Sequence, residues 1–351
     1  MSVNLGFAQA SSDFLTAALL IYSLAVLAFA GDYAFGRPRR SAVAKAAAPA
    51  VAQLATVGAG SAAGTAGSVG EAAPPAPPEP PARPVRPLGA FRSMWAAGPW
   101  VRVAVTLSAI GMLAHLIAII TRGLAVHRAP WGNMYEFVTA LTCVAAIFFG
   151  YIVVRYRAWP LGVFVIGAVT ISLGLAEALI NTPAGPLVPA LQSYWLSIHV
   201  TAMTLATGIF FVAAVLGILY LVSERYRKRV AAGKIPGGNG LIERIPSAEQ
   251  LDKLTYRTVV FGFPVWTFGV MAGAIWADQA WGRYWGWDPV ETWAFVTWVI
   301  YAAYLHARAT AGWRGSRAHY IQLLAFATLM INIFVIQIFV TGMHSYAGVA
   351  G

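Results

Sequence analysis

The chain carries one unusually dense cluster of aromatic side chains, near its C-terminal end. Residues 276–293 read WADQAWGRYWGWDPVETW. Five tryptophans and one tyrosine fall within this segment: Trp276, Trp281, Tyr284, Trp285, Trp287 and Trp293. Tryptophan and tyrosine also gather at membrane–water interfaces, which would account for a few of them. A run this dense, with glycines that let the backbone turn between the indoles, instead predicts a binding surface for a flat aromatic ligand with an apolar face.

Two of the six histidines are predicted to lie at the same depth as this aromatic segment. His199, in YWLSIHVTAM, lies about one turn inside the end of an apolar stretch, and His344, in TGMHSYAG, follows the end of another. Imidazole is the commonest protein ligand of heme iron. A lone histidine near a membrane surface is usually an ordinary polar residue, but two that bracket an indole-rich segment predict the axial ligands of a heme.

A third histidine, His306 in YAAYLHAR, is predicted to serve a different site. It follows Glu291 by fifteen residues, which is roughly 22 Å along a helix. It therefore cannot bind the same heme as His199 and His344 in one arrangement. Ionisable groups at such depth in a membrane are costly and are candidates for function, so we expect a second heme site lower in the membrane.

The acidic residues that follow the aromatic cluster allow two interpretations. Asp288, Pro289 and Glu291 have the types and spacing of an N-cap, a first-turn proline and the third residue of a capping box. The structural interpretation therefore accounts for them as the start of a helix. A role for the two acids in the chemistry of the site is the second interpretation.

Other ionisable groups lie near the same regions. Arg122, Arg128 and Arg283 could neutralise heme propionates, and Arg283 is the best placed because it lies inside the aromatic segment. Glu177 is a candidate for gating or hydrogen bonding. His319, at the start of the last apolar stretch, is predicted only to mark the opposite membrane interface.

The composition shows what must position these residues. Hydrophobic residues make up 59% of the chain and charged residues only 11%, so a soluble protein is excluded and an all-α, polytopic membrane bundle is predicted. The sole cysteine, Cys143, excludes an internal disulfide and a CxxC redox carrier. Eight transmembrane helices are predicted, at about 14–35, 103–121, 135–154, 160–180, 195–222, 257–275, 290–307 and 319–341.

The basic residues predict the orientation of this bundle. Of the 24 Lys and Arg, all but Arg122, Arg128 and Arg283 fall in connections on one side. The positive-inside rule makes that side cytoplasmic, so both termini and the aromatic segment are expected on the external face of a bacterial plasma membrane. The net charge of +11 is thus a signal of topology, and nucleic-acid binding is not predicted.

Composition also predicts three parts. Residues 1–36 contain an N-terminal transmembrane anchor. Residues 37–102 are rich in alanine and proline and form a flexible cytoplasmic linker that cannot bury a core. Residues 103–351 form a seven-helix membrane domain with an external tryptophan-rich loop at 276–293.

Taken together, these motifs resemble a known family. WGRYWGWDPVETWAF is similar to the WWD-type signature of heme-handling proteins in cytochrome c maturation. PWGNMYEF, LQSYWLSIHV, YLHAR and GMHSYAG resemble the CcsA (ResC) branch of the system II cytochrome c synthases, over roughly residues 103–349.

The resemblance implies roles for the histidines. His199 and His344 match the external pair that axially ligates heme beside the tryptophan loop, and His306 matches the membrane-embedded histidine of the site at which heme enters. The aromatic residues of the loop, with Arg283 and Asp288, complete the expected heme site. The heme is heme b, handled as a substrate.

The resemblance also implies an activity and its partners. It predicts a holocytochrome c synthase (heme lyase) that joins heme to the CxxCH segment of apocytochrome c and works only in a complex with a CcsB (ResB) type membrane protein. Thiol-reducing maturation proteins are further expected partners. Two alternatives stay open: a heme exporter, and a system I type protein that loads heme onto a chaperone without attaching it.

Overall fold

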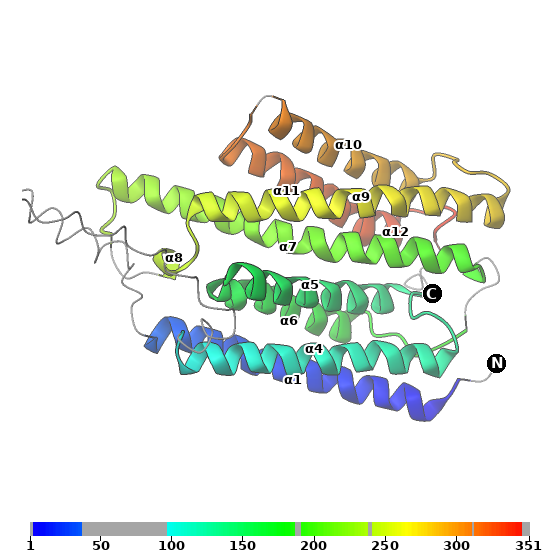
Figure 1. Ribbon diagram of the computed structural model, residues 1–351. Helices are drawn as coiled ribbons and strands as arrows, with labels where there is room; N and C mark the ends of the chain where they lie inside the picture. The colour runs from blue at the N-terminus through cyan, green and yellow to red at the C-terminus, as the bar shows by residue number, and fades with distance from the viewer. Residues whose placement is uncertain (1–2, 37–96, 187–190, 238–240, 311, 346–351) are drawn as a thin grey trace, which may run out of the picture.

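The computed structural model describes residues 3–36, 97–186, 191–237, 241–310 and 312–345. Within these ranges every regular element is a helix, and the long helices run side by side along one bundle (Figure 1). In order they are α1 (Leu5–Phe35), α4 (Pro99–Val126), α5 (Met134–Tyr156), α6 (Gly162–Leu179), α7 (Tyr194–Ala231), the short α8 (Leu241–Arg244), α9 (Ala248–Trp281), α10 (Pro289–Ala309) and α11 (Ser316–Ile331). A π-helical segment, η3 (Asn332–Ile336), continues α11 into α12 (Gln337–Phe339).

The predicted polytopic helical membrane bundle is confirmed, so this is a multi-pass membrane protein. Among the described residues, seven helical segments are long and apolar enough to cross a membrane. The stretch predicted at 290–307 does form a helix, α10, but it is not one of the seven. Its composition explains the difference, because side chains such as Glu291, Thr297, Tyr301 and Tyr304 lower the hydropathy of the helix.

Several helices extend beyond the predicted apolar spans. α9 begins at Ala248, where the side chains and backbones of Ser247 and Gln250 form a capping box. It ends at Trp281 and is capped by Gly282, which has the left-handed conformation. Such caps satisfy the backbone groups that a helix end leaves free, so the helix can continue into polar sequence. The prediction that residues 276–293 form a loop is therefore wrong at both ends, since only 282–288 connect α9 to α10.

Among the described residues, the two larger hydrophobic cores share α7, and a small third core joins Leu191, Leu196 and Trp276. One of the larger cores is formed by α1, α4, α5 and α6 with one side of α7, and includes Tyr22, Phe29 and Phe149. The other lies among α7, α9, α10 and α11, and includes Phe210 and Trp266. α10 packs on α11 and α9 and lies at one edge of the bundle, while α1 and α4 lie at the opposite edge (Figure 1).

The two ends of the bundle differ in side-chain character. α1 begins and α12 ends at the same end, where α9 also passes into the aromatic connection to α10; we call this the tryptophan end (Figure 1). At the other end, the last turns of α7 carry Arg225, Arg227, Lys228 and Arg229 beside α8. We call it the basic end.

Candidate functional site

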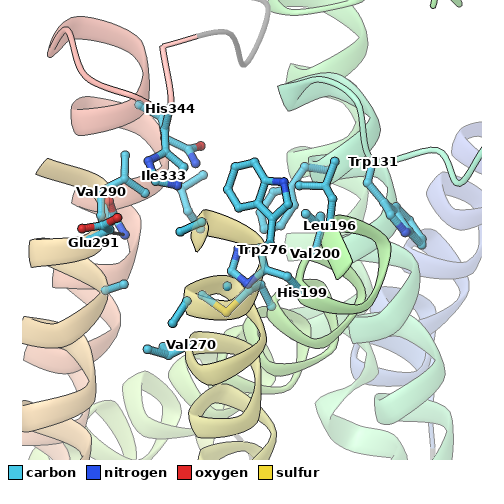
Figure 2. Close-up of a pocket in the computed structure, with 18 of the residues that line it drawn as sticks. Trp131, Leu196, His199, Val200, Val270, Trp276, Val290, Glu291, Ile333 and His344 are labelled. Atoms are coloured by element: carbon cyan, nitrogen blue, oxygen red, sulfur yellow. Dashed lines mark hydrogen bonds between the residues drawn. The ribbon is translucent and has the colours of Figure 1, made fainter. Parts of the chain in front are cut away.

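A pocket opens at the tryptophan end among α7, α9, α10 and η3 (Figure 2). Its cavity volume is about 160 Å³. His199, Trp276, Glu291 and His344 line it, and Trp131 stands on its far side (Figure 2). The structure therefore brings together the two histidines that the sequence placed at one level, although they are far apart along the chain.

His199 is fixed in this pocket by the backbone of α9. It lies in the second turn of α7, a helix that begins where the side chain of Ser193 accepts a hydrogen bond from Trp195 N. The Nδ1 atom of His199 lies 2.7 Å from the carbonyl oxygen of Gly269. A Cβ atom at Gly273 would come within 2.6 Å of this imidazole, so glycine is needed for the approach of the two helices. Because Nδ1 donates to the carbonyl, the lone pair of the ring is on Nε2.

His344 is fixed by a carboxylate. It follows α12, and its Nδ1 lies 2.8 Å from Oδ1 of Asp288, the N-cap residue of α10. The other carboxylate oxygen accepts a hydrogen bond of 2.6 Å from the backbone N–H of Met343. Burial alone would raise the pKa of the Asp288 carboxyl, but the contacts with His344 and the backbone hydrogen bonds from Met343 and Val290 together hold that pKa below its usual range. Nε2 of His344, like that of His199, makes no hydrogen bond within the described residues.

The helix start that the sequence predicted at Asp288 is present. Asp288 accepts a hydrogen bond from Val290 N, while Oε2 of Glu291 accepts from the backbone of Asp288 and of Gly286. The contact between Asp288 and His344 was not predicted. These residues are 56 positions apart, and no local pattern joins them.

Trp276 lies between the two histidines (Figure 2). Its ring is nearly parallel to that of His199, with centroids 6.0 Å apart, and meets the ring of His344 edge-on at 5.7 Å. Trp281 packs on both Trp276 and His344, at 4.8 and 5.0 Å. The indole of Trp276 is 2% exposed, and its Nε1 is buried without a hydrogen-bond partner.

This position of Trp276 limits what the pocket can hold. Pockets for cofactor-sized ligands are roughly 300–1,000 Å³, and the cavity here is about 160 Å³. The two imidazoles and the aromatic walls fit the donor set and the apolar faces of a heme. The indole of Trp276 occupies the space between the two imidazoles.

The other predicted residues of the aromatic segment fall into two groups. Tyr284 and Trp285 line the pocket. Trp287 does not line it: the residue has a left-handed backbone conformation and is 67% exposed, with its ring edge-on to Trp285 at 5.8 Å. Arg283 lies against Gly286, and His306 is exposed on α10 towards the basic end, so neither lines this pocket.

Arg122 and Arg128, predicted to face propionates, are engaged elsewhere. Both pair with the buried carboxylate of Glu136, at 3.0 and 2.8 Å. Arg122 also donates to the carbonyl of Thr182, while Glu136 accepts from the backbone N–H of Gly132. The three side chains thus fix the segment that presents Trp131 to the pocket. The aromatic residue inside PWGN was the signal that could have identified Trp131 as a site residue.

Two further predictions have clear outcomes. Glu177 accepts hydrogen bonds from Tyr135 and Asn181, which agrees with a hydrogen-bonding role. His319 is not a simple interface residue, because it is 1% exposed and its Nε2 lies 3.1 Å from Asp252. The sequence places it at the start of a span, but the packing of α7, α9 and α11 buries it.

Known proteins are similar to this chain in sequence. The family described as Cytochrome C assembly protein matches residues 131–344. The chain is 38% identical over 234 residues to the cytochrome c biogenesis protein CcsA of Guillardia theta, covering 62% of this chain and 76% of that protein. It is 32% identical over 277 residues to the CcsA of Synechococcus sp. (strain CC9605), covering 72% of this chain and 90% of the relative.

One solved structure is similar in fold. Cytochrome c Heme Lyase CcmF superposes with a TM-score of 0.57 over 95% of this chain, at 17% sequence identity. The match covers 47% of that structure, so this chain spans about half its length. At this identity the likeness shows a shared fold alone.

Proposed function

Since this chain belongs to the Cytochrome C assembly protein family and is a CcsA-type cytochrome c biogenesis protein, we propose that it binds heme b at the tryptophan end and promotes its covalent attachment to apocytochrome c. The heme is the substrate, with His199 and His344 as axial ligands of its iron. Trp276, Trp281, Tyr284 and Trp285 contact the faces and edges of the macrocycle.

One observation carries this proposal. Two imidazoles face one aromatic pocket, and each has its Nδ1 occupied, by the Gly269 carbonyl in one case and by Asp288 in the other. Metal-binding histidines ordinarily donate one ring N–H to a carbonyl or carboxylate, which fixes the tautomer and leaves the other nitrogen for the metal. Both His199 and His344 are already in that state.

The chain contributes mainly orientation to the reaction. Each thiol of an apocytochrome CxxCH segment adds across a vinyl C=C of the heme, with sulfur bonding to one carbon and the proton ending on the other. No atom is lost and no net oxidant is needed. The histidine of the segment replaces one axial ligand. Holding the heme edge beside the two thiols raises their effective concentration. Orientation is the main contribution of a protein when the reactive groups belong to the cofactor and the substrate.

The exposed face of α10 supports the proposal that a partner subunit and a second heme bind at this helix. Phe295 and Val299 are each 42% exposed, and His306 is exposed on the same side of this edge helix. A lone imidazole on an outer helix face can provide one axial ligand, so the second ligand at that depth would come from another chain. We assign this place to a CcsB-type partner, with heme entering at His306 and active synthase formed only by the complex.

The same proposal includes an orientation. The tryptophan end faces the outside of a bacterial plasma membrane and the basic end faces the cytoplasm, because Arg225, Arg227, Lys228 and Arg229 gather at the latter. Reporter fusions after His344 should register as external, and fusions within 223–237 as cytoplasmic. A cytoplasmic reporter after His344 would contradict the orientation.

Covalent attachment is tested by replacing the two ligands. The chain is co-expressed with a CcsB-type partner and an apocytochrome c in cells that lack maturation. His199→Ala and His344→Ala should each reach the membrane, abolish covalent attachment and move the bound-heme spectrum away from low-spin six-coordination. Added imidazole should restore part of both, because it can occupy the vacated axial position.

The matched control is His127→Asn. His127 is also a histidine at the tryptophan end, but it is exposed, lies outside the pocket and has a left-handed backbone that asparagine tolerates. Wild-type maturation by both ligand variants without imidazole would refute the assignment. Six-coordinate heme bound by the wild type without any thioether product would instead identify an exporter or a heme-loading protein.

A further inference from the structure

The two imidazoles of the pocket are held by acceptors of different strength. Nδ1 of His199 faces a backbone carbonyl, that of Gly269, at 2.7 Å. Nδ1 of His344 faces a carboxylate oxygen of Asp288 at 2.8 Å. The two distances are nearly equal, so the difference between the contacts is chemical: one acceptor is neutral and the other can carry a full negative charge.

The side chain of Asp288 is buried and accepts hydrogen bonds from several donors. Its side chain is 2% exposed and accepts two further hydrogen bonds, from the backbone N–H groups of Met343 and Val290. It also caps the N-terminus of α10, where the helix dipole favours negative charge. The same carboxylate therefore holds the backbone next to His344 and the ring itself.

Little room remains for this contact to change. A Cβ atom at Gly342 would lie 2.5 Å from Oδ2 of Asp288, so the segment that carries His344 passes directly over the carboxylate. On the other side, Glu291 accepts from the backbone N–H of Asp288 at 3.1 Å. Asp288 is thus fixed from both sides, and through its contact with Nδ1 it fixes the imidazole of His344.

An acceptor behind a metal-binding imidazole changes how strongly it binds. A carboxylate draws the Nδ1 proton towards itself, so Nε2 becomes a more basic donor, and loss of such an outer partner typically costs about 10–100-fold in metal affinity. A neutral carbonyl does this more weakly. The two histidines that we assign to heme should therefore be unequal ligands.

We propose that Asp288 is a positioning residue that makes His344 the stronger of the two axial ligands, with His199 the weaker. This inference rests on the proposed function, because it requires heme iron between the two imidazoles. It adds to the aspartate a role that its position at a helix start does not reveal.

The first test separates charge from helix capping. In Asp288→Asn the cap is kept, since asparagine caps as well as aspartate, but the carboxylate behind His344 becomes a neutral amide. Heme affinity of the purified chain should fall by about 10–100-fold, and the reduction potential of bound heme should rise because the ferric state loses donor strength. The melting temperature of the heme-free protein should fall, because the amide NH2 would face the Met343 N–H where an acceptor stood, so the potential is the readout that separates charge from capping.

The matched control is Ser247→Ala, which removes half of the same kind of capping box at the start of α9, at the basic end. It should lower the melting temperature while leaving heme affinity and potential unchanged. If Asp288→Asn behaved in the same way, with lower stability and an unaltered potential, Asp288 would be only a helix cap and the inference would be wrong.

A second test does not depend on the stability of one variant. In His344→Gly, imidazole should bind in place of the lost ring, and adding Asp288→Asn should weaken that binding by about tenfold or more. In His199→Gly the added imidazole sits beside the Gly269 carbonyl, so Asp288→Asn should leave its affinity unchanged. Equal effects in the two backgrounds would overturn the proposal.

The outcomes also distinguish this inference from the proposed function. If neither His199→Ala nor His344→Ala alters the heme spectrum, the pocket is not the heme site and the proposed function fails. If both alter it while Asp288→Asn keeps wild-type affinity and potential, the heme site stands and only the unequal ligation is refuted.

Discussion

An aspartate–histidine pair lies at each end of the bundle. The two pairs differ in the surroundings of the histidine. At the tryptophan end, Asp288 binds Nδ1 of His344, and the ring lines a pocket. At the basic end, Asp252 binds Nε2 of His319 at 3.1 Å, and the ring is stacked on Tyr220 with centroids 3.9 Å apart.

The basic-end pair also has a third member. Arg308 donates two hydrogen bonds to the carboxylate of Asp252, at 2.7 and 3.0 Å, so both oxygens are occupied by a cation. Nδ1 of His319 is buried without a partner. This histidine faces packed side chains on every side that the structure describes, whereas His344 keeps one nitrogen towards a cavity.

The difference shows what makes a buried histidine available for ligation. A carboxylate beside an imidazole is not sufficient, because a nearby arginine and a stacked ring turn the same pair into a link between helices. The free nitrogen must also face space that a ligand can fill. On this basis the tryptophan-end pair should govern heme binding, and the basic-end pair should govern stability.

The largest expected effect, on stability, comes from a substitution that breaks the basic-end cluster. Arg308→Ala leaves the Asp252 carboxylate uncompensated in a largely buried place, where the side chains of Arg308 and Asp252 are 8% and 13% exposed. Removing one partner of such an ion pair costs about 3–5 kcal/mol in the free energy of unfolding. The measurement is thermal unfolding in detergent, and the heme spectrum of the protein that stays folded should be that of the wild type.

Lys253→Ala is the matched control for that experiment. Lys253 pairs with Glu249 on the same helix as Asp252, but these side chains are 61% and 77% exposed. An exposed pair contributes at most about 1 kcal/mol, so the melting temperature should hardly move. A changed heme spectrum in Arg308→Ala, without loss of stability, would show that the basic end also takes part in ligation.

A medium effect is expected from Gly273→Ala, which acts on the tryptophan end alone. The added methyl group would lie 2.6 Å from Nδ1 and Cε1 of His199 and must push the ring away from the Gly269 carbonyl. Because that carbonyl orients the ligand, heme affinity should fall about tenfold or more. Heme titration of the purified chain measures it.

Gly167→Ala serves as its control, since a Cβ atom there meets nothing within 4 Å. Alanine is also the better helix former, so α6 should be slightly stabilised. Unchanged heme affinity in Gly273→Ala would mean that His199 does not need its present position to ligate, which would weaken the contrast between the two ends.

The smallest effect should come from Trp287→Ala. Trp287 belongs to the aromatic segment but is 67% exposed and does not line the pocket. Its loss should change stability by no more than about 0.5 kcal/mol and should leave the heme spectrum intact, whereas Trp285→Ala, at the pocket wall, should lower heme affinity. If the two variants lost equal affinity, the exposed edge of the segment would be part of the heme site.

The sequence by itself determined the class of this protein and predicted which residues would form its site. Long apolar stretches fix a helical membrane bundle because each spanning backbone must satisfy its own hydrogen bonds. The start of α10 was predictable from Asp288, Pro289 and Glu291, since a capping box acts within four residues. The grouping of indoles with two histidines likewise indicated a heme-handling site, and residues 131–344 match the family that the motifs indicated.

Only the tertiary structure decided what each of these side chains does. It set Trp276 between His199 and His344, turned Trp287 outward, and buried His319 against Asp252. The partners of His199 and His344 are 70 and 56 residues away in the chain. Hydropathy and capping are local properties that a short window of sequence contains, but contacts across such distances depend on how whole helices pack, and packing follows from all their side chains at once.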